Sequence, residues 1–187
     1  MTTFAELHRT GDPLLLPNAW DVGSAVAIAA AGAKAIATTS AGVAWSLGVP
    51  DGADLGAERQ AAVIERIVGA VGVPVSADIE AGYDSVEATV AAVVQAGAAG
   101  INLEDRVGAD LLDPAEQADR LAAARAAGGS VWINARTDVY LAGSRRLDEV
   151  QRRAEAYAAA GADSLFVPGL IDLKALEELA GGRCPSR

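Results

Sequence analysis

Residues 94–105 read VQAGAAGINLED, a helical stretch, a glycine and a short apolar run that finishes in two acidic residues. The same order recurs as AAAGAKAIATTS at residues 29–40 and as AAAGADSLFVPG at residues 158–169. In each copy the glycine follows an alanine-rich stretch, and glycine ends helices readily because it adopts left-handed backbone angles without a Cβ clash. The repeat therefore predicts joints between a helix and a following strand.

Six short apolar runs are predicted to be buried parallel strands, which lack the polar alternation of half-exposed strands. These runs are Leu14–Pro17, Lys34–Thr39, Val75–Ile79, Gly100–Glu104, Val131–Arg136 and Ser164–Val167. Helical periodicity fills the intervals at Val22–Ala31, Ala57–Val71, Ser85–Ala96, Pro114–Ala127, Leu147–Ala160 and Leu173–Ala180. The alternation leaves two architectures, an open doubly wound sheet or part of a (β/α)8 barrel.

The positions of the polar residues favour the barrel. A doubly wound nucleotide-binding domain carries a glycine-rich phosphate loop after its first strand, and LLLPNAWDVGSA at residues 14–25 contains none. Charged residues recur instead at the carboxyl ends of strands, where barrel enzymes place their chemistry. Because a full barrel takes about 250 residues, we expect residues 1–187 to form a single α/β domain of the (β/α)8 TIM-barrel type, truncated after the sixth βα unit. The first and sixth strands would then be unpaired edges, and residues 181–187 a tail.

Composition narrows the class of protein. Of the 187 residues, 51% are hydrophobic and only 4% aromatic, which suits an aliphatic α/β core and excludes intrinsic disorder. The net charge of −10 repels phosphate backbones and anionic lipid surfaces, so we expect neither a nucleic-acid nor a membrane partner. Cys184 is the single cysteine, which favours a reducing compartment. Without a basic and apolar leader, the chain is expected to be cytoplasmic.

Charged side chains lie at the carboxyl ends of three predicted strands and in one loop. They are Asp78, Glu80, Glu104, Asp105, Arg136, Asp138 and, in the loop, Asp51. Residues two apart in a strand point the same way, so Asp78 and Glu80 can face one site. Converging carboxylates repel one another unless a cation lies between them, and oxygen ligands without His or Cys select Mg²⁺, with Mn²⁺ as a second possibility. Capping of the following helices is the alternative for each acidic residue, but capping requires no arginine on a neighbouring strand. We therefore predict a metal site at Asp78, Glu80 and Glu104.

Two further groups are candidates for substrate binding. Arg136 is predicted to grip a carboxylate or phosphoryl group, although a purely structural ion pair is the alternative. Ser40, Ala41 and Gly42 offer a hydroxyl and backbone N–H groups to an anion, and an ordinary Ser/Gly turn explains them equally well. His8 precedes the first strand, and we assign it no catalytic role.

Five motifs, in this order, resemble the isocitrate lyase and phosphoenolpyruvate mutase superfamily. They are LPNAWD (16–21), TTSAGVAWSLGVPDG (38–52), SADIEAGY (76–83), INLEDR (101–106) and INARTD (133–138). The resemblance implies a barrel with Mg²⁺ at its mouth, where the enolate of a pyruvate-like substrate or product is stabilised. It also implies a role for each matching residue: Asp78 as the direct metal ligand, Glu80, Glu104 and Asp51 as holders of metal-bound waters, Arg136 as the substrate arginine, and Ser40, Ala41 and Gly42 as the segment that binds the substrate carboxylate. A cation and an arginine both lower the cost of charge on an enolate oxygen.

The resemblance also limits the reaction. Lyases of the superfamily carry a cysteine in the loop after the fourth strand, whereas LEDRVGADLLDP at residues 103–114 has neither Cys nor His. The implied chemistry is cleavage or rearrangement of a C–C or P–C bond in a small 2-oxo acid or phosphonate. Family members continue into further βα units and exchange a final helix between subunits, which implies a homo-oligomer. A non-catalytic truncated paralogue, which binds only metal or a full-length partner, is the alternative.

Overall fold

The structure, a computed structural model, describes residues 3–9 and 11–181. Within them one parallel sheet has six strands in the order β1-β2-β3-β4-β7-β8. Its strands are β1 (Asn18–Ala19), β2 (Ile36–Thr38), β3 (Val75–Asp78), β4 (Gly100–Glu104), β7 (Trp132–Arg136) and β8 (Ser164–Phe166). The strands β5 (Arg106–Val107) and β6 (Asp110–Leu111) form a separate antiparallel hairpin. Cys184 and residues 182–187 of the predicted tail lie outside the described residues.

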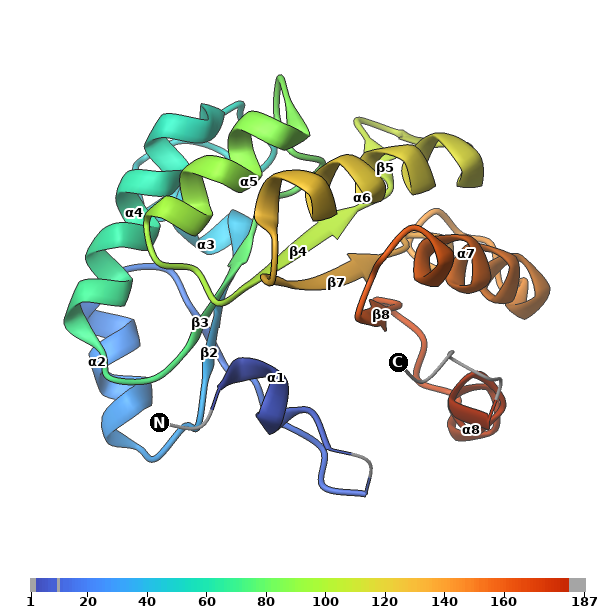
Figure 1. Cartoon of the computed structure of the whole chain (residues 1–187), viewed down its shortest axis with the longest axis horizontal. Coiled ribbons are helices and arrows are strands. Elements are labelled where there is room, and N and C mark those ends of the chain that lie inside the picture. The colour runs from blue at the N-terminus through green and yellow to red at the C-terminus, as the bar shows by residue number, and fades with distance from the viewer. Residues whose placement is uncertain (1–2, 10, 182–187) are drawn as a thin grey trace.

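Helices cover the outer side of the curved sheet, as Figure 1 shows for α2, α4, α5, α6 and α7. The helices are α1 (Phe4–Leu7), α2 (Val22–Ala30), α3 (Ser40–Ser46), α4 (Gly56–Ala70), α5 (Val86–Gln95), α6 (Pro114–Gly128), α7 (Leu147–Ala159) and α8 (Leu173–Gly181). In the described part of the chain, β1 and β8 are the two edges of the sheet, as predicted. The βα alternation and the barrel-type curvature predicted from the sequence are confirmed.

Alternation along the strands separates the core from the inner side of the sheet. In β4, Ile101 and Leu103 are fully buried in the larger hydrophobic cluster, together with residues of α4, α5 and α6. Asn102 and Glu104, on the other face of the same strand, line a cavity on the inner side. A second cluster packs α2 and α4 against β2 and β3. The period of two in a strand therefore directs every second side chain away from the core and toward the site.

Local chemistry explains where the helices begin. Asp113 accepts the backbone N–H of Ala115 at 2.8 Å, and Pro114 occupies the first turn of α6, where its missing N–H costs no hydrogen bond. Ser85 caps α5 in the same way through the N–H of Ala88. No helix among the described residues has the length and apolar character that crossing a bilayer takes.

Three local expectations were wrong or incomplete. The first strand is Asn18–Ala19 and not Leu14–Pro17. Asn18 lies opposite Ala37, and the Pro17 carbonyl still accepts the Ala37 N–H, but Pro17 has no N–H to give to the ladder. Residues 14–16 would lie opposite residues that precede β2, where no strand is available to pair with them. Ser40 begins α3, a helix that the sequence did not predict. The segment after β4 is the β5–β6 hairpin, also unforeseen.

The short helix α1 covers the inner side of the sheet near the amino ends of β4 and β7. A Cβ atom on Gly100 would lie 2.6 Å from the Phe4 ring, so only glycine admits Phe4 at this place. Phe4 also meets the Trp132 ring edge-on, with centroids 6.4 Å apart. The N-terminal segment therefore closes one end of the space that the sheet encloses.

Candidate active site

A cavity of about 810 Å³ lies on the inner side of the sheet. Seven of the predicted site residues line it: Ser40, Ala41, Asp51, Asp78, Glu80, Glu104 and Arg136. They come from the carboxyl ends of β3, β4 and β7 and from the segments that follow β2. The topology thus brings together charged groups that are up to 85 residues apart in the sequence, from Asp51 to Arg136.

Asp78 ends β3, and only 8% of its surface is exposed. Its Oδ2 accepts the backbone N–H of Ser40 at 3.0 Å, and its Oδ1 accepts the side-chain amide of Asn102 at 3.1 Å. The backbone N–H of Asp78 donates to Thr38 Oγ1 at 2.9 Å. Oδ1 also accepts the backbone N–H of Glu80 at 3.4 Å, so both of its lone pairs are engaged. Oδ2 accepts only the Ser40 N–H and keeps a lone pair that can bind a cation.

Glu80 follows β3 in a left-handed conformation, with φ at 52°. Its Oε1 accepts the hydroxyl of Tyr83 at 3.1 Å. Burial raises the pKa of Glu80, the Tyr83 hydrogen bond opposes this rise, and the negative charges of Asp78, Asp51 and Asp54 add to it. The carboxyl therefore lies in a region of accumulated negative charge.

Glu104 and Arg136 end the neighbouring strands β4 and β7 as register partners. Arg136 Nη1 lies 2.9 Å from Glu104 Oε2, while Nε and Nη2 donate to the two oxygens of Asp138 at 2.6 and 2.9 Å. Burial raises the pKa of Glu104 to about 7, although Arg136 lowers it. These contacts use three of the five guanidinium N–H groups, so two remain for an anionic substrate.

The donor set fits a hard divalent cation. Asp78, Glu80 and Glu104 offer only oxygen, and the raised pKa values of Glu80 and Glu104 reflect burial and negative charge that a cation would relieve. In the described ranges no group of three Asp, Glu, His or Cys side chains is placed to hold a metal ion. Mg²⁺ prefers oxygen ligands and usually keeps several of its waters, binding through one or two carboxylates.

Ser40, Ala41 and Gly42 occupy the first turn of α3 and not an open strand-end loop. Ser40 and Ala41 line the cavity, and the N–H of Ser40 is engaged by Asp78. Gly42 lies outside the cavity lining, and a Cβ atom there would come within 2.9 Å of Trp20. Close packing against Trp20 thus explains why residue 42 is a glycine, whereas the sequence predicted that this residue binds the substrate carboxylate.

Asp105 does not join the site, although it adjoins Glu104. It is fully buried on the other side of the sheet, where its Oδ2 accepts from Arg153 at 2.8 Å and from Tyr157 at 2.7 Å. Its Oδ1 accepts the backbone N–H of Asp138 at 2.9 Å. Asp105 therefore joins β4 to α7 and to the end of β7, which is a structural role.

Three polar residues on the inner side of the sheet were not among the predicted site residues. Asn102, Asn134 and Ser164 line the cavity and are joined to Asp78 by side-chain hydrogen bonds. The sequence pattern could have identified two of them. Asn102 and Asn134 interrupt apolar strands two residues before Glu104 and Arg136, and residues two apart in a strand face the same side. His8 lies at the same cavity and stacks on Trp132, with centroids 4.1 Å apart.

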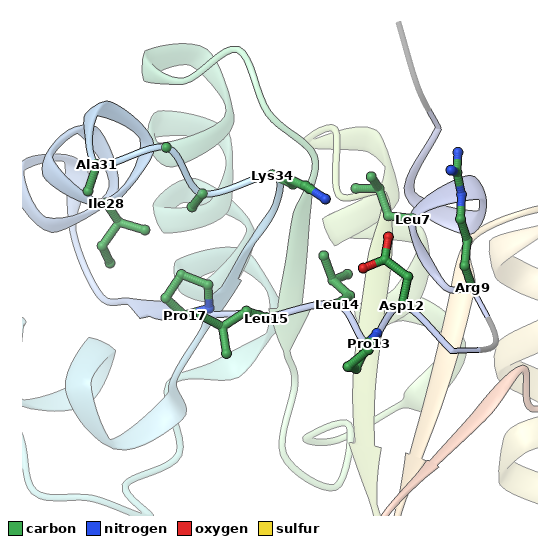
Figure 2. A pocket seen from close by; sticks show the side chains of 12 residues that line it. Leu7, Arg9, Asp12, Pro13, Leu14, Leu15, Pro17, Ile28, Ala31 and Lys34 are labelled. Atoms are coloured by element: carbon green, nitrogen blue, oxygen red, sulfur yellow. The ribbon is translucent and has the colours of Figure 1, made fainter.

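Two other hollows lie away from these carboxylates. One, of about 580 Å³, is formed by the segment before β1 and the turn between α2 and β2, at the amino end of the sheet (Figure 2). The other, of about 970 Å³, is mostly apolar and lies between α7, β8 and α8. Neither contains the cluster of acidic side chains, so the chemistry belongs to the inner cavity.

Relatives of known sequence match most of the chain. A protein of Mycobacterium tuberculosis without a known activity is 42% identical over 95% of this chain and 69% of its own length. The 2-methylisocitrate lyase of Escherichia coli is 32% identical over 90% of this chain and 62% of its own length. The chain therefore spans about three fifths of the length of this lyase.

Solved structures match the fold closely. A candidate phosphonomutase of Burkholderia cenocepacia is 46% identical, with a TM-score of 0.89 over 94% of this chain and 77% of that one. A phosphonopyruvate hydrolase in complex with oxalate and Mg²⁺ is 25% identical, with a TM-score of 0.82 over 94% of this chain and 65% of that one. The family model for phosphoenolpyruvate phosphomutase matches residues 4–183. The chain belongs to this family and, with it, to the phosphoenolpyruvate mutase and isocitrate lyase superfamily that its motifs resemble.

Proposed function

We propose that the chain is a Mg²⁺-dependent lyase or phosphonomutase-like enzyme. Its reaction would cleave or rearrange a C–C or P–C bond next to the enolate of a small 2-oxo acid or phosphonate. The observation that carries the proposal is the convergence of Asp78, Glu80, Glu104 and Arg136 on one cavity. The relatives support the class, since they include a 2-methylisocitrate lyase and a phosphonopyruvate hydrolase solved with oxalate and Mg²⁺.

Each residue has a role in this proposal. Asp78 would hold Mg²⁺ directly, and Glu80, Glu104 and Asp51 would hold its waters. When bound, Mg²⁺ supplies Lewis-acid stabilisation of negative charge on an enolate oxygen. Arg136 orients the substrate carboxylate or phosphonate through its two remaining N–H groups.

Proton transfer is assigned to Glu104. The β5–β6 hairpin carries neither Cys nor His, so it lacks the acid–base group found in the lyases that the sequence resembles. Glu104 lines the cavity, and its carboxylate lies 2.9 Å from the Arg136 guanidinium that would hold the substrate, so it is placed to move a proton there. Mn²⁺ has the same preference for oxygen ligands and is the second candidate ion.

Turnover of oxaloacetate and phosphonopyruvate with Mg²⁺ tests the proposal. We expect activity in the wild type and a loss of roughly hundredfold or more in Asp78→Ala and Arg136→Ala, because each removes charge stabilisation at the reacting centre. Glu65→Ala, an exposed change on α4, is the matched control and should retain activity. Circular dichroism establishes that the variants are folded.

A non-catalytic paralogue is the second candidate function. The two sheet edges, β1 and β8, and the apolar hollow beside β8 favour it, since they offer a surface to a full-length partner. A folded wild type with no turnover on either substrate would support this function and contradict the first.

A further inference from the structure

Four residues form a line across the inner side of the sheet. Asp78 lies opposite Asn102, Asn102 opposite Asn134, and Asn134 opposite Ser164, each pair being register partners on neighbouring strands. Their side chains are hydrogen-bonded along the line: Ser164 Oγ donates to Asn134 Oδ1 at 2.7 Å and Asn134 Nδ2 to Asn102 Oδ1 at 2.9 Å. Asn102 Nδ2 then donates to Asp78 Oδ1 at 3.1 Å. We call these four residues the polar rung.

The two ends of the polar rung fix its direction. At one end Trp132 Nε1, which can only donate, gives its hydrogen to Ser164 Oγ at 2.9 Å. At the other end the Asp78 carboxylate only accepts when it is ionised. Both asparagine amides must therefore present nitrogen toward Asp78 and oxygen toward Ser164. All the hydrogens in the line point toward Asp78.

Helix α1 holds the donor at the head of the line. The His8 ring stacks on the Trp132 ring at 4.1 Å with an interplanar angle of 13°, and His8 Nδ1 is 2.9 Å from the Phe4 carbonyl oxygen. Phe4 meets the same indole edge-on. These contacts leave the indole N–H of Trp132 directed at Ser164.

We propose that the polar rung and Trp132 are positioning residues that orient the Asp78 carboxylate for the cation. This inference rests on the proposed function, because it assigns Asp78 the role of metal ligand. Hydrogen bonds in such a line polarise one another, so a change two strands away reaches Asp78. Groups that hold a metal ligand from behind commonly change metal affinity by about 10- to 100-fold when they are removed.

Asn134→Asp separates positioning from simple electrostatics. The new carboxylate accepts from Ser164 and from Asn102, which forces the Asn102 amide to turn its oxygen toward Asp78. Positioning therefore predicts Mg²⁺ binding weaker by about 10-fold or more. Electrostatics alone predicts the opposite, since an added negative charge about two strand spacings from Asp78 attracts the cation.

The measurement is isothermal titration calorimetry with Mg²⁺ alone, at one fixed pH, on the full chain. Trp132→Phe keeps an aromatic ring but removes the first donor, and we expect binding weaker by about twofold because one bond of a cooperative line is lost. Ser130→Ala, an exposed change outside the polar rung, should match the wild type. Circular dichroism and thermal unfolding identify any variant that fails to fold, and Asn134→Ser then replaces Asn134→Asp as a smaller interruption with the same expected direction.

The outcomes are distinct. Tight binding by the wild type and weak binding by folded Asn134→Asp support the positioning role. Equal or tighter binding by folded Asn134→Asp overturns it and leaves the proposed function standing. A folded wild type that does not bind Mg²⁺ contradicts the proposed function and the positioning role together.

Discussion

Glu104 has an unusual proton affinity for a glutamate, and its surroundings explain it. Burial raises the pKa of its carboxyl from 4.5 to about 7, against the opposing effect of Arg136 at 2.9 Å. The folded state therefore binds this proton more tightly than the unfolded chain does. The stability that follows is fully present below about pH 4.5 and is lost as the pH rises through 7.

Glu104→Gln removes this titration. Between pH 5 and pH 8, in EDTA, the free energy of unfolding of the wild type should fall by roughly 1–3 kcal/mol more than that of Glu104→Gln. Urea unfolding at each pH measures both. Parallel curves for the two proteins would show that the carboxyl titrates in its ordinary range.

Strand-end residues were the most predictable part of the site, with one instructive error. Asp78, Glu80 and Glu104 line the cavity because strand ends meet at one edge of a parallel sheet, which the sequence order alone implies. Asp105 was grouped with them, but neighbours in a strand face opposite sides, and Asp105 packs against α7. The polar rung depends on the register between strands, which no single strand reveals.

At the level of elements, the packing of α1 against β4 depends on Gly100, which leaves room for the Phe4 ring. A Cβ atom at Gly100 would approach Phe4 at 2.6 Å and Ser76 Oγ at 3.1 Å. Gly69, within α4, has no heavy atom within 4 Å of the same added atom. The same substitution should therefore have opposite effects at these two positions.

Gly100→Ala is expected to destabilise the protein by about 1–3 kcal/mol, because the new methyl group displaces Phe4 and with it α1. Gly69→Ala should stabilise it by about 0.5–1 kcal/mol, because alanine favours the helix interior. Urea unfolding of the two variants gives both values. A stabilising Gly100→Ala would show that α1 does not pack as described.

Most strands and helices were predicted to within two residues, helped at several places by a helix-ending glycine, whereas the first strand and α3 were not. The strands β4 and β8 each follow such a glycine, Gly97 and Gly161, both with positive φ. The first strand was misplaced because its limits are set by where β2 offers partners. The two-turn helix α3 has small residues and a glycine, so its sequence resembles a turn, and its conformation depends on contact with Asp78 and Trp20.

At the level of the whole molecule, the described sheet curves around the site but has two edges. The strands β1 and β8 are unpaired on one side, and the apolar hollow of about 970 Å³ lies beside β8. Ile171 and Leu173, at the start of this region, are 82% and 74% exposed. Exposed sheet edges and apolar surfaces of this kind commonly bind other chains. They are consistent with the homo-oligomer expected from the sequence, which stays a prediction.

We propose that this chain assembles a site for a divalent cation and an oxyacid on the inner side of its sheet. The decisive measurement is thermal unfolding in EDTA, in Mg²⁺, and in Mg²⁺ with oxalate, because ligands that bind only the folded state raise its stability. At about 100 times the dissociation constant the gain is about 2.7 kcal/mol, a rise in Tm of roughly 5–10 °C for a protein of this size. We predict one cooperative transition that Mg²⁺ raises and oxalate raises further, with both shifts absent in Asp78→Ala. A cooperative transition in the wild type that neither ligand moves would contradict the claim.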